Sequence, residues 1–236
     1  MVMVRSIGAA CLLLPLALLL NGCGGSDEGP ESATAVVADV SGSAERSDLR
    51  KQSVSAFQSA VLDMTAPAKV KFLAFNMEVG SSTCPPLVAS LPWSGSTTTD
   101  NDTKEAIAAQ IPGNVASYVD CAKGSVEKGG SDVVGGIVAG QGLVADAPGA
   151  KRIVLLTDGC QRYRFKTCTA DITDTDWRAQ TIESLPESLK PDLTGIDLTI
   201  EGLARGTDLQ GEEVQGLKDF YKEYAAATGA NLTIAE

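Results

Sequence analysis

Residues 34–43 read TAVVADVSGS, a short apolar run that gives way abruptly to a polar turn. The residues AVVA before Asp39 are apolar on both faces, which is typical of a strand buried on both sides of a sheet. Ser41 and Ser43 then flank Gly42, so a tight turn can direct both hydroxyls toward one point. This segment therefore predicts a central strand with oxygen donors at its carboxyl end.

Strand and helix patterns alternate along the rest of the chain. We expect strands at 34–39, 69–75, 152–157, 195–203 and 231–235, and a weaker edge strand at 86–92 because prolines are tolerated there. We expect helices at 44–64, near 102–111 with an extra segment to about 128, at 133–147 and at 209–227.

The alternation predicts an α/β fold: a Rossmann-like, doubly wound, mostly parallel central sheet with helices on both faces. The sequence stops at Glu236 just after the last expected strand, so no C-terminal helix is expected there. The helix at 133–147 contains four glycines, each of which weakens a helix by up to about 1 kcal/mol. Close packing of that helix on the sheet is a physical reason to keep them.

Three polar segments should meet at one edge of this sheet. They are DVSGS at 39–43, GGSD at 129–132 and LLTDG at 155–159. The carboxyl ends of central strands share an edge in a doubly wound sheet, and ligands bind there. Carboxylates and hydroxyls are hard oxygen donors that suit Mg²⁺ first, and also Mn²⁺ or Ca²⁺. These three segments therefore offer the donor types of a divalent-metal site.

These motifs, in this order, resemble the metal-ion-dependent adhesion site of von Willebrand factor type A domains. The resemblance covers residues 34–236, and Ser131 stands where the family usually has threonine. It implies a cation bound by Asp39, Ser41, Ser43, Ser131 and Asp158. The last coordination position would be filled by water or by a carboxylate from a protein partner. A second interpretation is local: Asp39 and the serines only cap the helix expected to begin near Ala44, and TDG is only a strand-ending turn.

The N-terminus has the pattern of an export signal. Arg5 precedes the apolar run at 7–20, which is too short to span a bilayer, and LNGC at 20–23 resembles a bacterial lipobox. We expect residues 1–22 to be a lipoprotein signal peptide, Cys23 to be lipidated, 23–33 to be a flexible tether and 34–236 to be one domain. The protein is then exported and lipid-anchored to the cell membrane or envelope.

Composition excludes several classes of function. The chain has 19 basic and 30 acidic residues, so it has no general attraction for nucleic acid. It has no histidine, which excludes Ser-His-Asp and Cys-His nucleophile systems and His-ligated metals. Four cysteines remain after export, and an even number in an oxidising compartment suggests two disulfides among three possible connectivities. We expect the local pairs Cys84–Cys121 and Cys160–Cys168.

The loop at 160–168, CQRYRFKTC, is basic and aromatic in an otherwise acidic chain and begins two residues after Asp158. One interpretation is a stapled surface hairpin with solvated charges. The other is a partner-binding surface, in which alternation places the basic side chains on one face and the aromatic ones on the other. Its residues are Arg162, Tyr163, Arg164, Phe165 and Lys166.

The sequence favours a binding module over an enzyme. The leading hypothesis is a metal-dependent adhesion or assembly protein that captures an Asp or Glu of a protein partner. One alternative is a structural subunit of an envelope complex whose metal only stabilises the loops. Another is a metal-dependent hydrolase with Asp39 as nucleophile, which is disfavoured because no general base is evident and the serines suit ligation better.

We predict that Cys23→Ser blocks acylation and normal processing of the exported chain. Each buried methylene of an acyl chain contributes about 0.8 kcal/mol to membrane attachment, so the unacylated domain should leave the membrane fraction. Acyl-biotin labelling of both proteins and N-terminal analysis of the wild type measure this. A mature wild-type N-terminus anywhere other than Cys23 would reject lipidation.

Overall fold

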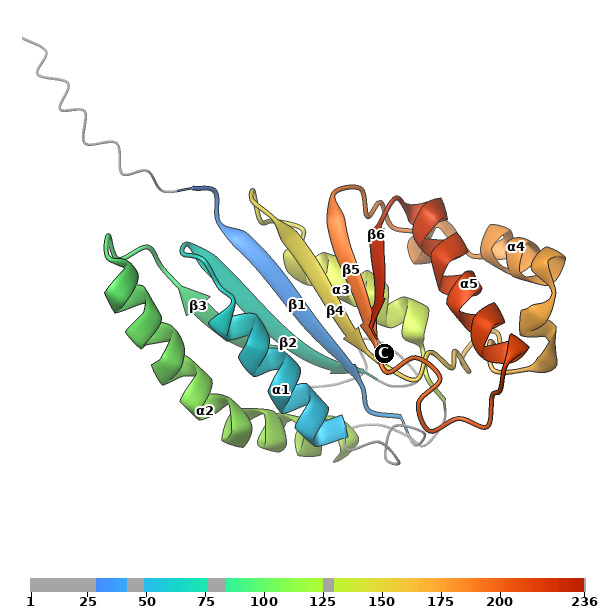
Figure 1. Ribbon diagram of the computed structural model, residues 1–236, viewed down its shortest axis with the longest axis horizontal. Coiled ribbons are helices and arrows are strands. Elements are labelled where there is room, and N and C mark those ends of the chain that lie inside the picture. Colours follow the sequence, from blue (N-terminus) through green and yellow to red (C-terminus); the bar gives the residue numbers. More distant parts are fainter. Residues whose placement is uncertain (1–28, 42–48, 76–83, 125–129, 236) are drawn as a thin grey trace, which may run out of the picture.

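The computed structural model describes residues 29–41, 49–75, 84–124 and 130–235, and six strands form one sheet within them (Figure 1). The order is β3-β2-β1-β4-β5-β6, with β3 antiparallel to β2 and every other neighbouring pair parallel. The strands are β1 (Ser32–Asp39), β2 (Ala68–Phe75), β3 (Leu87–Leu91), β4 (Lys151–Leu156), β5 (Ile196–Glu201) and β6 (Asn231–Ala235). This confirms the predicted doubly wound, mostly parallel fold.

The strand order reverses between β1 and β4. From β1 the chain moves outward to β2 and β3, and it then returns to β4 on the other side of β1. The two strands are in register, with Ala38 opposite Leu156. Asp39 at the end of β1 and Asp158 just beyond β4 therefore share the crevice where ligands bind in folds of this kind.

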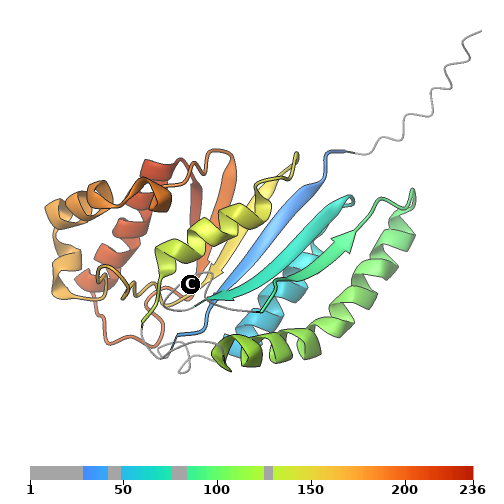
Figure 2. The ribbon, with the colours of Figure 1, turned by 180° about the vertical axis from the view of Figure 1, so that it is seen from behind.

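Helices cover both faces of the sheet (Figures 1 and 2). One face carries α1 (Leu49–Leu62) and α2 (Thr97–Gly124), and the other carries α3 (Val133–Val144), α4 (Thr175–Ser184) and α5 (Glu212–Thr228). β1 serves both cores by alternation: Ala35 and Val37 face the α3 side, and Val36 and Ala38 face the α1 side. None of the helices in the described ranges is long and apolar enough to cross a bilayer.

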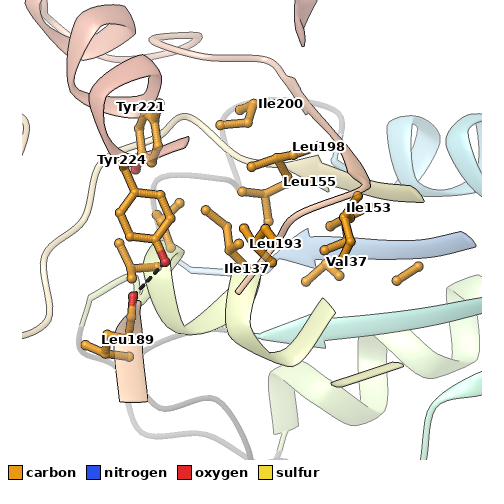
Figure 3. Close-up of a cluster of buried hydrophobic side chains, with 14 of the residues drawn as sticks. Val37, Ile137, Ile153, Leu155, Leu189, Leu193, Leu198, Ile200, Tyr221 and Tyr224 are labelled. Carbon is orange, nitrogen blue, oxygen red and sulfur yellow. Dashed lines mark hydrogen bonds between the residues drawn. The ribbon is translucent and has the colours of Figure 1, made fainter. Parts of the chain in front are cut away.

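The larger core lies between the sheet and helices α3 and α5 (Figure 3). Ile137 of α3 packs there with Val37 of β1 and Ile153 of β4, and all three side chains are fully buried. The Tyr224 hydroxyl of α5 donates a hydrogen bond of 2.7 Å to the Leu189 carbonyl, so its polar end is satisfied inside the core.

The prediction for the region after β3 is wrong in length. Where the sequence predicts a helix near 102–111 and a separate extra segment, α2 is one helix of 28 residues that continues past Pro112. An internal proline costs about 3 kcal/mol, which is why the pattern predicts an end there. Ile111, Val115 and Val119 are buried against the sheet on either side of the proline, and this packing outweighs the lost hydrogen bond. Figure 1 shows α2 curving along the sheet.

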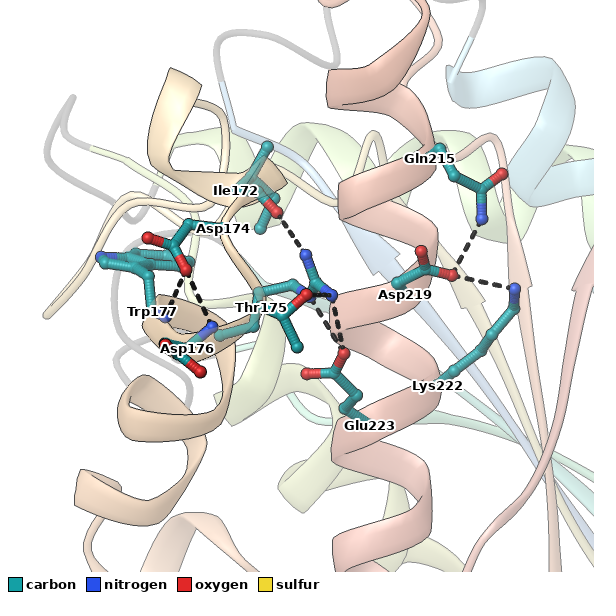
Figure 4. A network of polar contacts seen from close by, with 10 residues as sticks. Ile172, Asp174, Thr175, Asp176, Trp177, Gln215, Asp219, Lys222 and Glu223 are labelled. Atoms are coloured by element: carbon teal, nitrogen blue, oxygen red, sulfur yellow. Dashed lines mark hydrogen bonds and ion pairs between the residues drawn. The ribbon is translucent and has the colours of Figure 1, made fainter.

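The segment between β4 and β5 contains elements that the sequence analysis does not predict: two 3-10 turns, Ala170–Thr173 and Glu187–Leu189, on either side of α4. Asp174 caps α4 by accepting hydrogen bonds from two backbone N–H groups of its first turn. The buried Arg178 donates to the Ile172 carbonyl at 3.0 Å and pairs with Glu223 of α5 at 3.0 Å (Figure 4). This network holds the segment against α5.

Both disulfides form the pairs expected from the sequence. Cys84–Cys121 joins the residues before β3 to the last turns of α2. The Tyr118 hydroxyl also donates to the Cys84 carbonyl at 3.1 Å, which fixes the same end of α2. Cys160–Cys168 closes the loop after β4 across a sequence separation of 8.

The glycines of α3 allow the helix to approach the sheet closely. A Cβ on Gly140 would lie 2.9 Å from Ile153 Cγ2 and 3.2 Å from Val37 Cγ2, and a Cβ on Gly136 would lie 2.8 Å from the Phe75 ring. A Cβ on Gly142, two residues further along the helix, would have no atom within 4 Å. Packing explains Gly136 and Gly140 but not Gly142.

We predict opposite effects for two glycine-to-alanine variants in this helix. Gly140→Ala forces side chains of the core apart and should lower the free energy of unfolding by about 1–3 kcal/mol. Gly142→Ala fits without contact and should raise it by up to about 1 kcal/mol, because alanine favours the helix. Urea denaturation of both variants measures this. Equal effects would show that α3 does not pack as closely as described.

Candidate metal centre

Asp39 is the last residue of β1 and is completely buried. Its Oδ1 accepts a hydrogen bond from the Ser41 backbone N–H at 2.9 Å. Its Oδ2 accepts two more, from the hydroxyls of Ser131 at 2.5 Å and Thr157 at 2.9 Å. These contacts of Asp39 are with Ser41, Ser131 and Thr157, and none is with α1 (Leu49–Leu62) as the structure describes it. One carboxylate instead joins the ends of β1 and β4 to the start of α3.

Ser131 and Asp132, at the start of α3, have different hydrogen-bond partners. Asp132 is the N-cap, and its side chain accepts a hydrogen bond from the Gly135 backbone N–H at 3.2 Å. Ser131 is fully buried and turns toward Asp39. Since its hydroxyl proton is donated to Asp39, the lone pairs of its oxygen remain as acceptors. Asp132 therefore caps the helix, and the Ser131 oxygen remains a possible ligand of a cation.

Asp158 lies in the turn that follows β4 and is 7% exposed. Its Oδ1 accepts a hydrogen bond from the Cys160 backbone N–H at 2.8 Å. Its Oδ2 is buried and has no hydrogen-bond partner among the described residues. Gly159 has a φ of 78°, a left-handed conformation that lets the chain turn sharply here. A buried carboxylate oxygen without a partner is costly unless a cation or water compensates it.

The surroundings of Asp39 oppose its negative charge. Burial raises the pKa of the Asp39 carboxyl above its ordinary value, and the nearby Asp158 raises it further. Hydrogen bonds from Ser131 and Ser41 lower the same pKa and only partly offset the burial. A positive charge at this position would favour the ionised form of both carboxylates.

Negative charge also gathers around Tyr221 of α5, whose hydroxyl donates to the Gly159 carbonyl at 2.8 Å. The pKa of this phenol is raised well above its ordinary value, first by complete burial and then by nearby carboxylates. The carboxylates that contribute are those of Asp158, Asp39 and Asp132. The carboxylates of Asp39, Asp132 and Asp158 are therefore all near enough to this hydroxyl to act on it electrostatically.

The loop at 160–168 is fixed to the site from within by Gln161, which is fully buried. Its side-chain oxygen accepts from the Val134 backbone N–H at 3.1 Å, and its Nε2 donates to Asp132 Oδ1 at 3.2 Å. Thr167, also fully buried, accepts from the Gln161 N–H and donates to the Gly159 carbonyl, each at 2.9 Å. These contacts bind the loop to the first turn of α3.

The remaining loop residues alternate in exposure, as expected. Arg162, Arg164 and Lys166 are exposed, whereas Tyr163 and Phe165 are half-buried. The loop is not extended, however, because it bends and Arg164 has a φ of 72°.

The structure brings together most of the residues that the sequence predicts as ligands. Asp39, Ser41, Ser131 and Asp158 meet at the β1–β4 edge, and Ser43 lies outside the described residues, as does Cys23. The sequence analysis does not identify two residues that support the site, Thr157 and Gln161. Thr157 supplies a hydroxyl to Asp39, and its place beside Asp158 in the TDG motif was the available signal. Nothing in the sequence marks Gln161, because its side chain bonds to Val134 and Asp132 in a different segment.

The donor set fits a hard divalent cation. It consists of two carboxylates and several hydroxyls, and the described part of the chain has no group of three or more His, Cys, Asp or Glu side chains placed to hold a metal. Hydroxyl and water oxygens would therefore complete the coordination, as Mg²⁺ accepts readily.

A separate hollow of about 910 Å³ lies between α1 and strands β4–β6, and none of these ligands lines it.

No protein-family model matches the sequence, and no curated protein matches it either. Solved structures are similar in fold. One is the pilus adhesin SpaC from Lactobacillus rhamnosus GG in its open conformation, at 14% identity and a TM-score of 0.45, covering 88% of this chain and 28% of the adhesin. Another is an aerotolerance-related membrane protein from Bacteroides fragilis NCTC 9343, at 14% identity and a TM-score of 0.39, covering 88% of this chain and 92% of that one.

A third is a von Willebrand factor type A protein from Catenulispora acidiphila, at 15% identity and a TM-score of 0.40. The matched region covers 85% of this chain and 43% of that protein. The chain thus spans less than half the length of this protein and of the pilus adhesin. At such identities and TM-scores, the chemistry of the site rests on its own geometry.

We predict that Thr157→Val, a nearly isosteric change, lowers the free energy of unfolding by about 1–3 kcal/mol. The variant removes the donor to Asp39 and the acceptor of the Gly159 N–H, and leaves both buried partners short of a hydrogen bond. Thr233→Val, at an exposed position of β6, is the matched control and should change stability little. Chemical denaturation compares them, and equal losses would mean that Thr157 does not support Asp39.

Proposed function

We propose that this edge of the sheet binds a divalent cation and, through it, a carboxylate of a protein partner. The ligands are Asp39, Ser41, Ser43, Ser131 and Asp158, with Mg²⁺ as the first choice and Mn²⁺ or Ca²⁺ as substitutes. The observation that carries the proposal is the buried, unpartnered Oδ2 of Asp158. It lies in the same cluster as Asp39, whose carboxylate accepts three hydrogen bonds and keeps one acceptor site on Oδ1 for a cation.

Hydrogen bonding prepares the site for a cation. Ser131 donates its proton to Asp39 and so presents only lone pairs to other groups. Asp39 in turn accepts hydrogen bonds from Ser41, Ser131 and Thr157, which partly offset its negative charge. An ion held mainly by neutral hydroxyls is incompletely neutralised and attracts a further carboxylate. This supports capture of an Asp or Glu from outside.

The same geometry argues for binding rather than hydrolysis. A nucleophilic carboxylate must reach a substrate, but Asp39 is 0% exposed and accepts three hydrogen bonds. Adhesion or assembly therefore suits the site better than a reaction at Asp39.

The position of the site also suits display at an envelope. Ser32 begins β1 and Asp39 ends it, so the tether and the site lie at opposite ends of a strand about 26 Å long. A lipid on Cys23 would then hold the domain at the membrane with its cation directed away from the surface. This orientation leaves the site open to a partner.

We predict that Mg²⁺ or Mn²⁺ raises the melting temperature, because the ligands lie on loops that come together only in the folded chain. The stabilisation at a hundred times Kd is about 2.7 kcal/mol. Asp158→Asn keeps the acceptor for the Cys160 N–H and removes the charge, so it should fold normally and lose the shift. Asp39→Ala should lose it as well.

Asp146→Ala, at an exposed position after α3, is the charge-matched control and should keep the full shift. Thermal melts with EDTA, Mg²⁺ and Mn²⁺ compare the four proteins. The same ion-dependent shift in wild type, Asp39→Ala and Asp158→Asn would exclude this site.

A further inference from the structure

Three cations lie beside the proposed metal site without ion-pair partners. Arg162, Arg164 and Lys166 are exposed, and within the ranges that the structure describes none of them forms a salt bridge. The chain as a whole has a net charge of −11 and many surface acids available for pairing. Three exposed cations without a salt bridge are therefore concentrated within five residues of one loop.

The backbone of this loop is attached directly to a proposed ligand. The backbone N–H groups of Arg162 and Tyr163 both donate to the Ser131 carbonyl, at 2.9 and 3.1 Å. Arg162 also lies over Gly130, where a Cβ would approach the Arg162 Cβ to 3.1 Å. The loop begins at Cys160, whose backbone N–H donates a hydrogen bond to Asp158 Oδ1. The cations are thus held next to the residues that would hold the metal.

The loop is also rigid before any partner arrives. The Cys160–Cys168 bridge and the buried Gln161 fix its base, as described above. Phe165 packs on Phe220 of α5 with 5.8 Å between ring centroids. A loop fixed in this way loses little conformational entropy on binding.

Arg164 is held in a conformation that non-glycine residues rarely adopt. Its φ of 72° lies in the left-handed region, and its guanidinium sits 5.1 Å from the centroid of the Tyr163 ring. Stacking on an aromatic ring orients the guanidinium and leaves its N–H donors available at the edges. Such a group is suited to bidentate pairing with a carboxylate.

We propose that loop 160–168 is a second contact surface that selects an acidic peptide segment. This rests on the proposed function: one carboxylate of the segment binds the cation, and neighbouring Asp or Glu side chains pair with Arg162, Arg164 and Lys166. The acidic domain repels such a segment at long range, with screening beyond about 8 Å at physiological salt. The loop reverses that repulsion where the partner docks.

The test uses two fluorescein-labelled glycine–serine peptides, one with a single central aspartate and one with four glutamates around that aspartate. In Mg²⁺ at low salt, the wild type should bind the glutamate-rich peptide about tenfold more tightly, measured by fluorescence anisotropy. Changing Arg162, Arg164 and Lys166 together to Ser should abolish this preference and flatten its salt dependence. The Mg²⁺-induced rise in melting temperature should remain, which shows that the variant is folded and retains its metal site.

Two further variants complete the experiment. Changing Lys151, Lys190 and Lys222 to Ser removes the same charge outside the loop and should leave the preference intact. Arg162→Lys with Arg164→Lys keeps the charge and should retain the salt dependence with weaker binding, because lysine cannot pair bidentately.

The outcomes separate the two proposals. If the wild type binds both peptides equally in Mg²⁺, or binds neither, the loop does not select acidic segments and this inference is wrong. If the preference persists in EDTA and in Asp158→Asn, the loop binds acidic peptides by itself, and the proposed metal function is wrong instead.

Discussion

The carboxylate of Asp39 is the interaction on which the rest of the site depends. It lies at the point where the order of the strands reverses, and it accepts hydrogen bonds from Ser41 just after β1, from Ser131 before α3 and from Thr157 just after β4. A fully buried charge is stable only if its environment compensates it. The hydroxyls of Ser131 and Thr157 and the N–H of Ser41 provide part of that compensation.

The loop at 160–168 extends the same arrangement to the surface. Gln161 is bonded to the first turn of α3, and the neighbouring N–H groups are bonded to the Ser131 carbonyl. The residues around the proposed cation site therefore also position the exposed arginines. The fold thus couples a buried acidic site to a basic rim, and this pairing of opposite charges gives the surface its proposed selectivity.

Local sequence patterns were sufficient for the sheet and for the residue types at its edge. The apolar run before Asp39 and the TDG turn at Asp158 each predict a strand end, and the fold rules bring those ends together. The hydrogen bond from Thr157 to Asp39 was not predictable, because the fold rules place strand ends together but do not specify which side chains on them bond. The length of α2 was not predictable either, because burial on both sides of Pro112 overrides its local effect.

The most direct test of the central claim is a titration with Mn²⁺ followed by electron paramagnetic resonance, which detects free and bound ion separately. The account predicts one bound Mn²⁺ per wild-type chain, displaced by Mg²⁺, and none in Asp39→Asn, which keeps the size of the side chain and loses its charge. A wild-type chain that leaves all Mn²⁺ free, or an Asn variant that binds it as tightly as the wild type, would contradict the account.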